Sequence, residues 1–164
     1  MLALDPTAAL WFLLGAAPIC FWVAWSDLSS MRIPNKAVLA LTGVFAIVGL
    51  FVLPLPEYGF RWLQLAGVLL LGMVFNAAGA MGAGDAKFIA AAAPMVAPAD
   101  ATSVLVLLSA CLLTGYASHR IARATALRRM VPDWQSWTSG NRFPMGFPLA
   151  ATLVLYLGLA AAGS

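Results

Sequence analysis

Residues 62–80 read WLQLAGVLLLGMVFNAAGA, nineteen consecutive positions without a charged side chain. A helix needs about 20 mostly apolar residues to cross the hydrocarbon core of a bilayer, so this stretch is long enough to span a membrane. After Met81 it is followed by the glycine-rich segment Gly82-Ala83-Gly84-Asp85. The sequence therefore places a carboxylate beside a predicted membrane crossing, where charge is costly and an acid is first a functional candidate.

The composition of the whole chain agrees with this stretch. Of its 164 residues 63% are hydrophobic and 9% are charged, and the mean hydropathy is +0.93. These values exclude an ordinary soluble domain and predict an all-α, polytopic membrane helical bundle. The apolar runs predict about six transmembrane helices, near residues 8–25, 37–53, 62–80, 86–98, 101–118 and 145–162. We expect residues 1–164 to form a single integral membrane domain.

Two of the predicted spans have distinctive features. The run at 86–98 is short for a crossing and contains Pro94 and Pro98, so we expect a tilted, broken or re-entrant helix there. Asn76 lies among apolar neighbours in the third span, where an interhelical hydrogen bond is the expected fate of such an amide. The two cysteines, Cys20 and Cys111, lack metal-ligand spacing and are expected to be buried free thiols.

The basic residues indicate the orientation of the bundle. The loops after spans one, three and five contain eight of the nine positive charges: Arg32, Lys36, Lys87, Arg120, Arg123, Arg128, Arg129 and Arg142. The other side has Arg61, which we expect to form a solvated pair with Glu57. Because short cytoplasmic loops accumulate Lys and Arg, both termini are predicted to be non-cytoplasmic. Asp27 and Asp85 then both lie at the cytoplasmic boundary.

Asp27 and Asp85 are 58 positions apart but reach the same membrane face through different helices, so they can meet across the bundle. Two carboxylates that share a site do not both ionise easily. One holds a proton while the other activates a water to attack an amide carbonyl, and this chemistry requires no metal or cofactor. Asp85 stands near a helix N-terminus and Asp27 near a C-terminus, which predicts that Asp27 is the more readily protonated partner.

Three motifs carry a resemblance to a known family: Gly82-Ala83-Gly84-Asp85 with Lys87, the pair Asp27 and Arg32-Ile33-Pro34-Asn35, and Pro144-Met145-Gly146. Together they resemble the prepilin peptidases, or type IV leader peptidases, of the GxGD class of intramembrane aspartyl proteases. The similarity is specifically to their short form, which is associated with tight-adherence (Flp-type) pili.

The resemblance implies a function and a set of site residues. Family members remove the basic leader of a prepilin at the cytoplasmic face of the bacterial inner membrane. Asp27 and Asp85 match the catalytic pair, and the surrounding motif or substrate-binding positions are Gly82, Gly84, Lys87, Pro34, Asn35, Pro144 and Gly146. The family often has Pro-Tyr-Gly where this chain has Met145, so a role that depends on the tyrosine is not carried over. The cysteine-containing region of the longer, N-methylating members is absent from this sequence, and methyltransferase activity is not expected.

The motif glycines have a functional interpretation, because they permit a substrate backbone to come close to an acid. Several other residues also have a structural interpretation. Pro34 and Asn35 are suited to opening the second span without taking part in chemistry. Lys87 is equally well explained as an influence on the aspartates or as a headgroup anchor. The polar stretch 118–143, with its arginines, Trp134 and Trp137, is suited to anionic lipid headgroups, while a mobile lid over the active site is the alternative.

Other functions remain open at this stage. A small membrane transporter or a pilus-assembly scaffold would also explain two membrane acids and a broken span, although transport sites tend to lie near the bilayer midplane. A GxGD protease with another single-span substrate is a further alternative. The expected partners are a Flp-type prepilin and the lipid bilayer, with no nucleic acid, and the sequence leaves the oligomeric state open.

Overall fold

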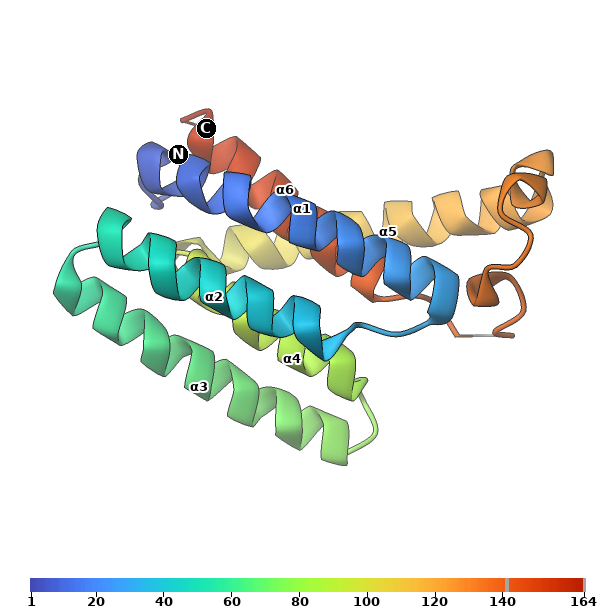
Figure 1. The fold of residues 1–164 in the computed structure, drawn as a ribbon, viewed down its shortest axis with the longest axis horizontal. Helices are drawn as coiled ribbons and strands as arrows, with labels where there is room; N and C mark the ends of the chain where they lie inside the picture. The colour runs from blue at the N-terminus through green and yellow to red at the C-terminus, as the bar shows by residue number, and fades with distance from the viewer. Residues whose placement is uncertain (141, 164) are drawn as a thin grey trace.

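The computed structural model describes residues 1–140 and 142–163, and in these residues it contains six α-helices. They are α1 (Pro6–Ser30), α2 (Asn35–Val52), α3 (Leu55–Ala77), α4 (Ala83–Ala92), α5 (Ala101–Ala124) and α6 (Gly146–Ala161). Figure 1 shows that successive helices run in alternating directions along the long axis, so the N- and C-termini lie at the same end. The connections from α1 to α2, α3 to α4 and α5 to α6 lie at the other end. The predicted all-α membrane bundle is confirmed.

The helices differ in whether they are long enough to cross a bilayer. α1, α2, α3 and α5 are four long, apolar candidate spans, whereas α6 is a shorter apolar helix. α4 has only 10 residues and continues as one 3-10 turn, Ala93–Met95. Pro94 in this turn has no N–H to donate to a continuing helix, so the expected break in the fourth span is confirmed. The helix begins earlier than predicted, at Ala83.

Three of the long helices extend beyond the predicted spans by more than two residues, because backbone hydrogen bonding continues past the ends of the apolar runs; α3 begins at Leu55 instead of residue 62. α1 is capped by Asp5, the residue before the helix, whose side chain accepts a hydrogen bond from the N–H of Ala8 at 2.9 Å, a favourable N-cap. The helix ends at Ser30 and is followed by the C-cap residue Met31, which has a left-handed φ of 53° and donates its N–H to the carbonyl of Asp27. α5 likewise continues to Ala124, so the first part of the polar stretch 118–143 is helical.

The buried core lies where α1 packs along α6 and α2, with α4 beneath them. Phe12, Leu41, Phe45, Met95 and Leu157 are almost fully buried there. α3 lies at the edge of the bundle and packs mainly on α4. A Cβ on Gly72 of α3 would lie 2.9 Å from the Cβ of Ala86, so glycine allows these two helices to approach closely.

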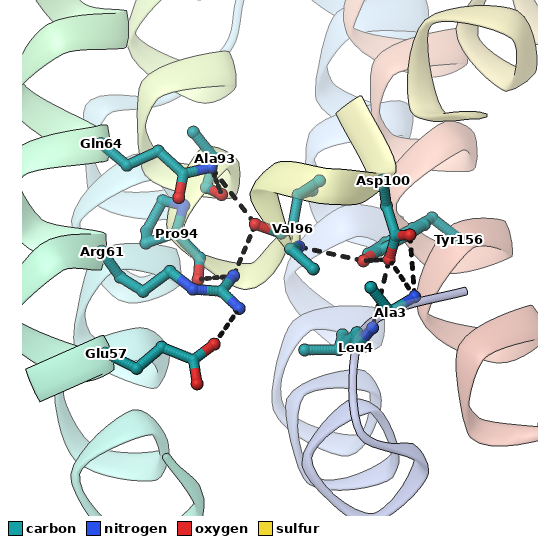
Figure 2. Close-up of polar contacts among 11 residues, drawn as sticks. Ala3, Leu4, Glu57, Arg61, Gln64, Ala93, Pro94, Val96, Asp100 and Tyr156 are labelled. Atoms are coloured by element: carbon teal, nitrogen blue, oxygen red, sulfur yellow. Dashed lines mark hydrogen bonds and ion pairs between the residues drawn. The ribbon is translucent and has the colours of Figure 1, made fainter. Parts of the chain in front are cut away.

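A buried polar network closes the break between α4 and α5, at the end of the bundle that holds the termini (Figure 2). Arg61 is only 1% exposed, pairs with Glu57 at 2.6 Å, and donates to the carbonyls of Pro94 and Val96. Gln64 donates to the carbonyl of Ala93 at 2.8 Å. The expected solvated pair of Glu57 and Arg61 is therefore wrong for Arg61, because its guanidinium satisfies carbonyls that the broken helix leaves free.

The other half of this network surrounds Asp100, which is 4% exposed. Its carboxylate accepts hydrogen bonds from the backbone N–H groups of Ala3 and Leu4 and from the hydroxyl of Tyr156 at 2.8 Å. The hydroxyl of Tyr156 in turn accepts the N–H of Ala97 at 3.1 Å. This carboxylate thus ties the N-terminal segment, α6 and the α4–α5 connection together.

Candidate active site

A cavity of about 790 Å³ opens at the end of the bundle opposite the termini, and both Asp27 and Asp85 line it. The glycine-rich segment 79–84, which comprises most of the connection after α3 and the first two residues of α4, forms one wall. Arg32 and Arg142 line it as well. The structure therefore brings together, from different helices, the two carboxylates that the sequence singled out.

Asp27 lies in the last turn of α1 and is 5% exposed. Its Oδ2 accepts a hydrogen bond from the backbone N–H of Gly146 at 2.6 Å, and Gly146 is the first residue of α6. Pro144 is fully buried just before it, and Met145 lines the cavity. Pro144-Met145-Gly146 is thus next to the first aspartate, although 119 positions separate the two bonded residues.

Asp85 lies in the first turn of α4, whose N-cap is Gly82. It stands outside the four long candidate spans. Burial raises the pKa of the Asp85 carboxyl above its ordinary value, while a hydrogen bond from the backbone N–H of Gly82 acts in the opposite direction. A Cβ on Gly82 would lie only 2.6 Å from Oδ2 of Asp85, which shows that the carboxylate folds back over the start of its own helix.

Both carboxylates therefore lie at helix N-termini, where the exposed N–H groups favour negative charge. Asp85 is at the start of α4, and Asp27, although it ends α1, receives the first N–H of α6. The prediction from the sequence took into account only the helix that carries each aspartate. That Asp27 is the more readily protonated partner stays a prediction, and the contact with Gly146 works against it.

Ile33 explains two of the motif glycines. A Cβ on Gly84 would lie 3.3 Å from the Cβ of Ile33, and a Cβ on Gly146 would lie 3.0 Å from Cγ1 and Cδ1 of the same side chain. Ile33 also lines the cavity. The space beside Gly84 thus holds a residue of the protein itself, where the sequence favoured room for a substrate backbone.

The remaining predicted site residues lie outside the cavity lining. Lys87 donates from Nζ to Oδ1 of Asn35 at 3.2 Å, which links α4 to the first residue of α2. Pro34 is the N-cap and Asn35 the first residue of α2, so both stand where the second helix opens; that they take no part in the chemistry stays a prediction. Asn76 donates to the carbonyl of Met81 at 2.8 Å. The expected interhelical bond of Asn76 is therefore wrong, because the amide holds the loop that follows its own helix.

Sequence reasoning did not single out Met31, Arg142 or Phe143, all of which line the cavity. Met31 enters the lining because its left-handed cap turns the chain at the end of α1. Arg142 and Phe143 immediately precede Pro144. Their closeness in sequence to a motif that proved to contact Asp27 was the available signal. Cys20 and Cys111 are free and buried, as predicted.

The comparisons with known proteins identify the family of the chain. The model of the type IV leader peptidase family matches residues 12–118, about two thirds of the chain, and this range includes both Asp27 and Asp85. Searches of curated proteins and of solved structures found no match. The family assignment favours a peptidase over the transporter and scaffold alternatives. The chain belongs to the type IV leader peptidase family and is an aspartic prepilin peptidase.

Proposed function

We propose that the chain removes the basic leader from a Flp-type prepilin, with Asp27 and Asp85 as the catalytic pair. The observation that supports this most strongly is that the two carboxylates line one cavity, although different helices carry them. Its volume of about 790 Å³ is in the range of cavities that hold small ligands, enough for a short extended stretch of peptide.

The chemistry follows from two carboxylates that share one proton. The ionised carboxylate takes a proton from a water molecule, and the resulting hydroxide attacks the scissile carbonyl carbon. The protonated carboxyl group donates its proton to the carbonyl oxygen, which gives a neutral tetrahedral diol. When the C–N bond breaks, the amine leaving group takes the proton that the first carboxylate had received from water. A hydroxyl of the diol gives its proton to the other carboxylate as the new carboxylic acid forms, and the shared proton is restored. In this scheme Gly146 holds Asp27 in place through its backbone N–H.

The active site faces the cytoplasm in this proposal. The cavity lies at the end of the bundle that carries the connections α1 to α2, α3 to α4 and α5 to α6. These connections and the adjoining helix ends contain eight of the nine basic residues, and short cytoplasmic loops are enriched in such residues. The termini then lie on the non-cytoplasmic side of the bacterial inner membrane.

The test is co-expression with a tagged Flp-type prepilin and separation of precursor from processed pilin on a gel. We compare the wild type with Asp27→Asn and Asp85→Asn, which keep side-chain size and remove charge. Asp133→Asn is the matched control, because Asp133 is an exposed acid in the connection between α5 and α6. Equal amounts of each variant in the membrane fraction are required before comparison.

The proposal expects cleavage by the wild type and by Asp133→Asn but by neither Asp27→Asn nor Asp85→Asn. Cleavage that persists in both dyad variants contradicts the catalytic assignment. If the wild type leaves the Flp-type precursor intact but processes another prepilin, the substrate assignment fails while the dyad is still tested on that second substrate.

A further inference from the structure

A second, smaller cavity of about 120 Å³ lies beside the catalytic one and has no part in the proposed reaction. It forms where the C-terminal end of α5 meets the segment before α6. Its wall consists of two aromatic residues, one histidine, three arginines and a glycine: Tyr116, Phe143, His119, Arg120, Arg123, Arg142 and Gly140.

His119 is the buried member of this cavity, with 7% of its surface exposed. Its ring stacks on Trp137, with ring centroids 4.9 Å apart and planes inclined by 19°, and meets the edge of Phe143 at 5.9 Å. These contacts fix the imidazole in position. Its Nε2 is buried and has no hydrogen-bond partner among the described residues. A buried polar nitrogen without a partner is unfavourable, so a ligand that accepts or donates a hydrogen bond there would satisfy it.

The charge of the cavity is one-sided. Arg120, Arg123 and Arg142 line it, and no carboxylate does. Within residues 1–140 and 142–163 the one ion pair is Arg61 with Glu57, at the far end of the bundle. Arg123 donates to the carbonyl of Gly140 at 3.3 Å, which turns the guanidinium toward the cavity-forming segment. Three like charges around so small a space repel one another, and an anion between them would remove that repulsion.

The place of the cavity in the bundle selects the anion. It lies at the end of a membrane-spanning helix, where lipid headgroups are found. Trp134 and Trp137 stack beside it with centroids 5.6 Å apart, and Trp134 meets the edge of Trp25 on α1 at 5.3 Å. Tryptophan is enriched at this depth in membrane proteins. The volume suits a single phosphate group better than a peptide, and the planar guanidinium group matches phosphate geometry.

We propose that this cavity binds the phosphate group of an anionic phospholipid of the surrounding membrane, held by Arg120, Arg123, Arg142 and Nε2 of His119. The sequence predicts that the stretch 118–143 contacts anionic headgroups, and this cavity would be one defined binding site within it. Because Arg142 also lines the catalytic cavity, the bound headgroup neutralises positive charge next to the place where a basic leader must enter.

Binding is measured on the detergent-purified full-length protein, so that the result does not depend on protease activity. Short-chain phosphatidylglycerol, short-chain phosphatidylcholine and inorganic phosphate are titrated separately, and bound molecules are counted by native mass spectrometry. The variant Arg120→Gln/Arg123→Gln is compared with Arg128→Gln/Arg129→Gln. Arg128 and Arg129 lie in the connection that follows α5 and do not line the cavity. The two double variants have the same net charge.

We expect the wild type to retain one phosphatidylglycerol in preference to phosphatidylcholine, and Arg120→Gln/Arg123→Gln to weaken that binding by about tenfold or more. Arg128→Gln/Arg129→Gln is expected to stay within about twofold of the wild type. Equal weakening by both variants overturns the proposal, since it would mean diffuse attraction without a site. Displacement of phosphatidylglycerol by equimolar inorganic phosphate also overturns it, because the ligand would then be free phosphate.

A further variant keeps the proposal testable if the double substitution does not fold. His119→Phe preserves the stack on Trp137 and removes Nε2. It is expected to reduce phosphatidylglycerol retention with unchanged elution on size exclusion. Wild-type retention by a folded His119→Phe protein overturns the assignment of His119 to the site.

Discussion

The backbone N–H of Gly146 donates to Oδ2 of Asp27 at 2.6 Å, which joins the start of α6 to the end of α1. The bond is buried and spans 119 positions of the chain. Because α1 and α6 pack on each other along much of their length, small shifts between them are resisted by the core. The position of one carboxylate of the proposed dyad is therefore set by the contact between the first and last helices.

This relationship predicts the effect of Gly146→Ala. A Cβ there would lie 3.0 Å from both Oδ2 of Asp27 and two carbons of Ile33, so one of the two must move. The side chain that gives way shifts by a few tenths of an ångström. Since a displacement of about 1 Å at a reacting group costs about 100-fold in rate, we expect kcat for leader removal to fall by about 3- to 10-fold. Thermal unfolding should change little, because the higher helix propensity of alanine, worth up to about 1 kcal/mol relative to glycine, opposes the cost of the crowded contact.

The matched control is Gly158→Ala, in the same helix, where a Cβ meets nothing within 4 Å. It should retain wild-type cleavage. Ile33→Val removes the Cδ1 atom that crowds position 146, so the double variant Ile33→Val/Gly146→Ala should recover part of the lost rate. Wild-type kcat in Gly146→Ala would show that Gly146 does not affect the function of Asp27.

The first glycine of the GxGD segment supports a second prediction. Gly82→Ala would place a Cβ 2.6 Å from Oδ2 of Asp85, so the carboxylate must rotate away from the start of α4. Cleavage should fall by about 10-fold or more, and the unfolding free energy by about 1 kcal/mol, because alanine is a poor N-cap. Gly67→Ala, which meets nothing within 4 Å, is the control. A Gly82→Ala enzyme with wild-type kcat would contradict this role.

Much of this arrangement was predictable from sequence because it depends on local signals. Hydropathy located the six helices, and the charge distribution placed Asp27 and Asp85 at the same end of the bundle. The break in the fourth span followed from Pro94. These features need no knowledge of which helices touch, which is why they could be read in advance.

The features that sequence reasoning missed depend on contacts between helices. Arg61 looked like a loop residue, and its burial arises only because the free carbonyls of Pro94 and Val96 lie against α3. The role of Ile33 requires Gly84 and Gly146 to lie on either side of it. Spacing along the chain contains no information about either contact.

Arg61 is accordingly predicted to be essential for stability. Arg61→Met leaves the carbonyls of Pro94 and Val96 without the donor that Arg61 supplies, at a cost of about 1–3 kcal/mol for each buried group. We expect a decrease in the unfolding free energy of about 2–5 kcal/mol, measured by denaturation in mixed micelles. Glu57→Gln is the control, because Glu57 is 42% exposed and should change stability by less than about 1 kcal/mol. Equal effects of the two substitutions would show that the carbonyl contacts contribute little.

Lys87 is predicted to have a small effect on cleavage. Its Nζ lies 3.2 Å from Oδ1 of Asn35 in an exposed position, outside the lining of the catalytic cavity. An exposed contact of this kind contributes about 1 kcal/mol or less. Lys87→Gln should therefore keep kcat/KM within about fivefold of the wild type. A larger loss at unchanged stability would assign Lys87 a direct effect on the aspartates.

The raised pKa of Asp85 predicts how stability depends on pH. Burial disfavours its ionised form, so the folded protein holds this proton more tightly than the unfolded chain, in which an aspartate has a pKa of about 3.9. Between the unfolded and the raised folded pKa the folded state binds more protons, and stability falls as pH rises. The favourable contribution is complete below the unfolded pKa and is lost as pH passes through the folded pKa. Asp85→Asn removes it, so the difference in melting temperature, variant minus wild type, should increase as pH rises above about 4. A flat difference for Asp85→Asn would mean that the folded and unfolded states bind this proton equally, against the burial that the structure shows.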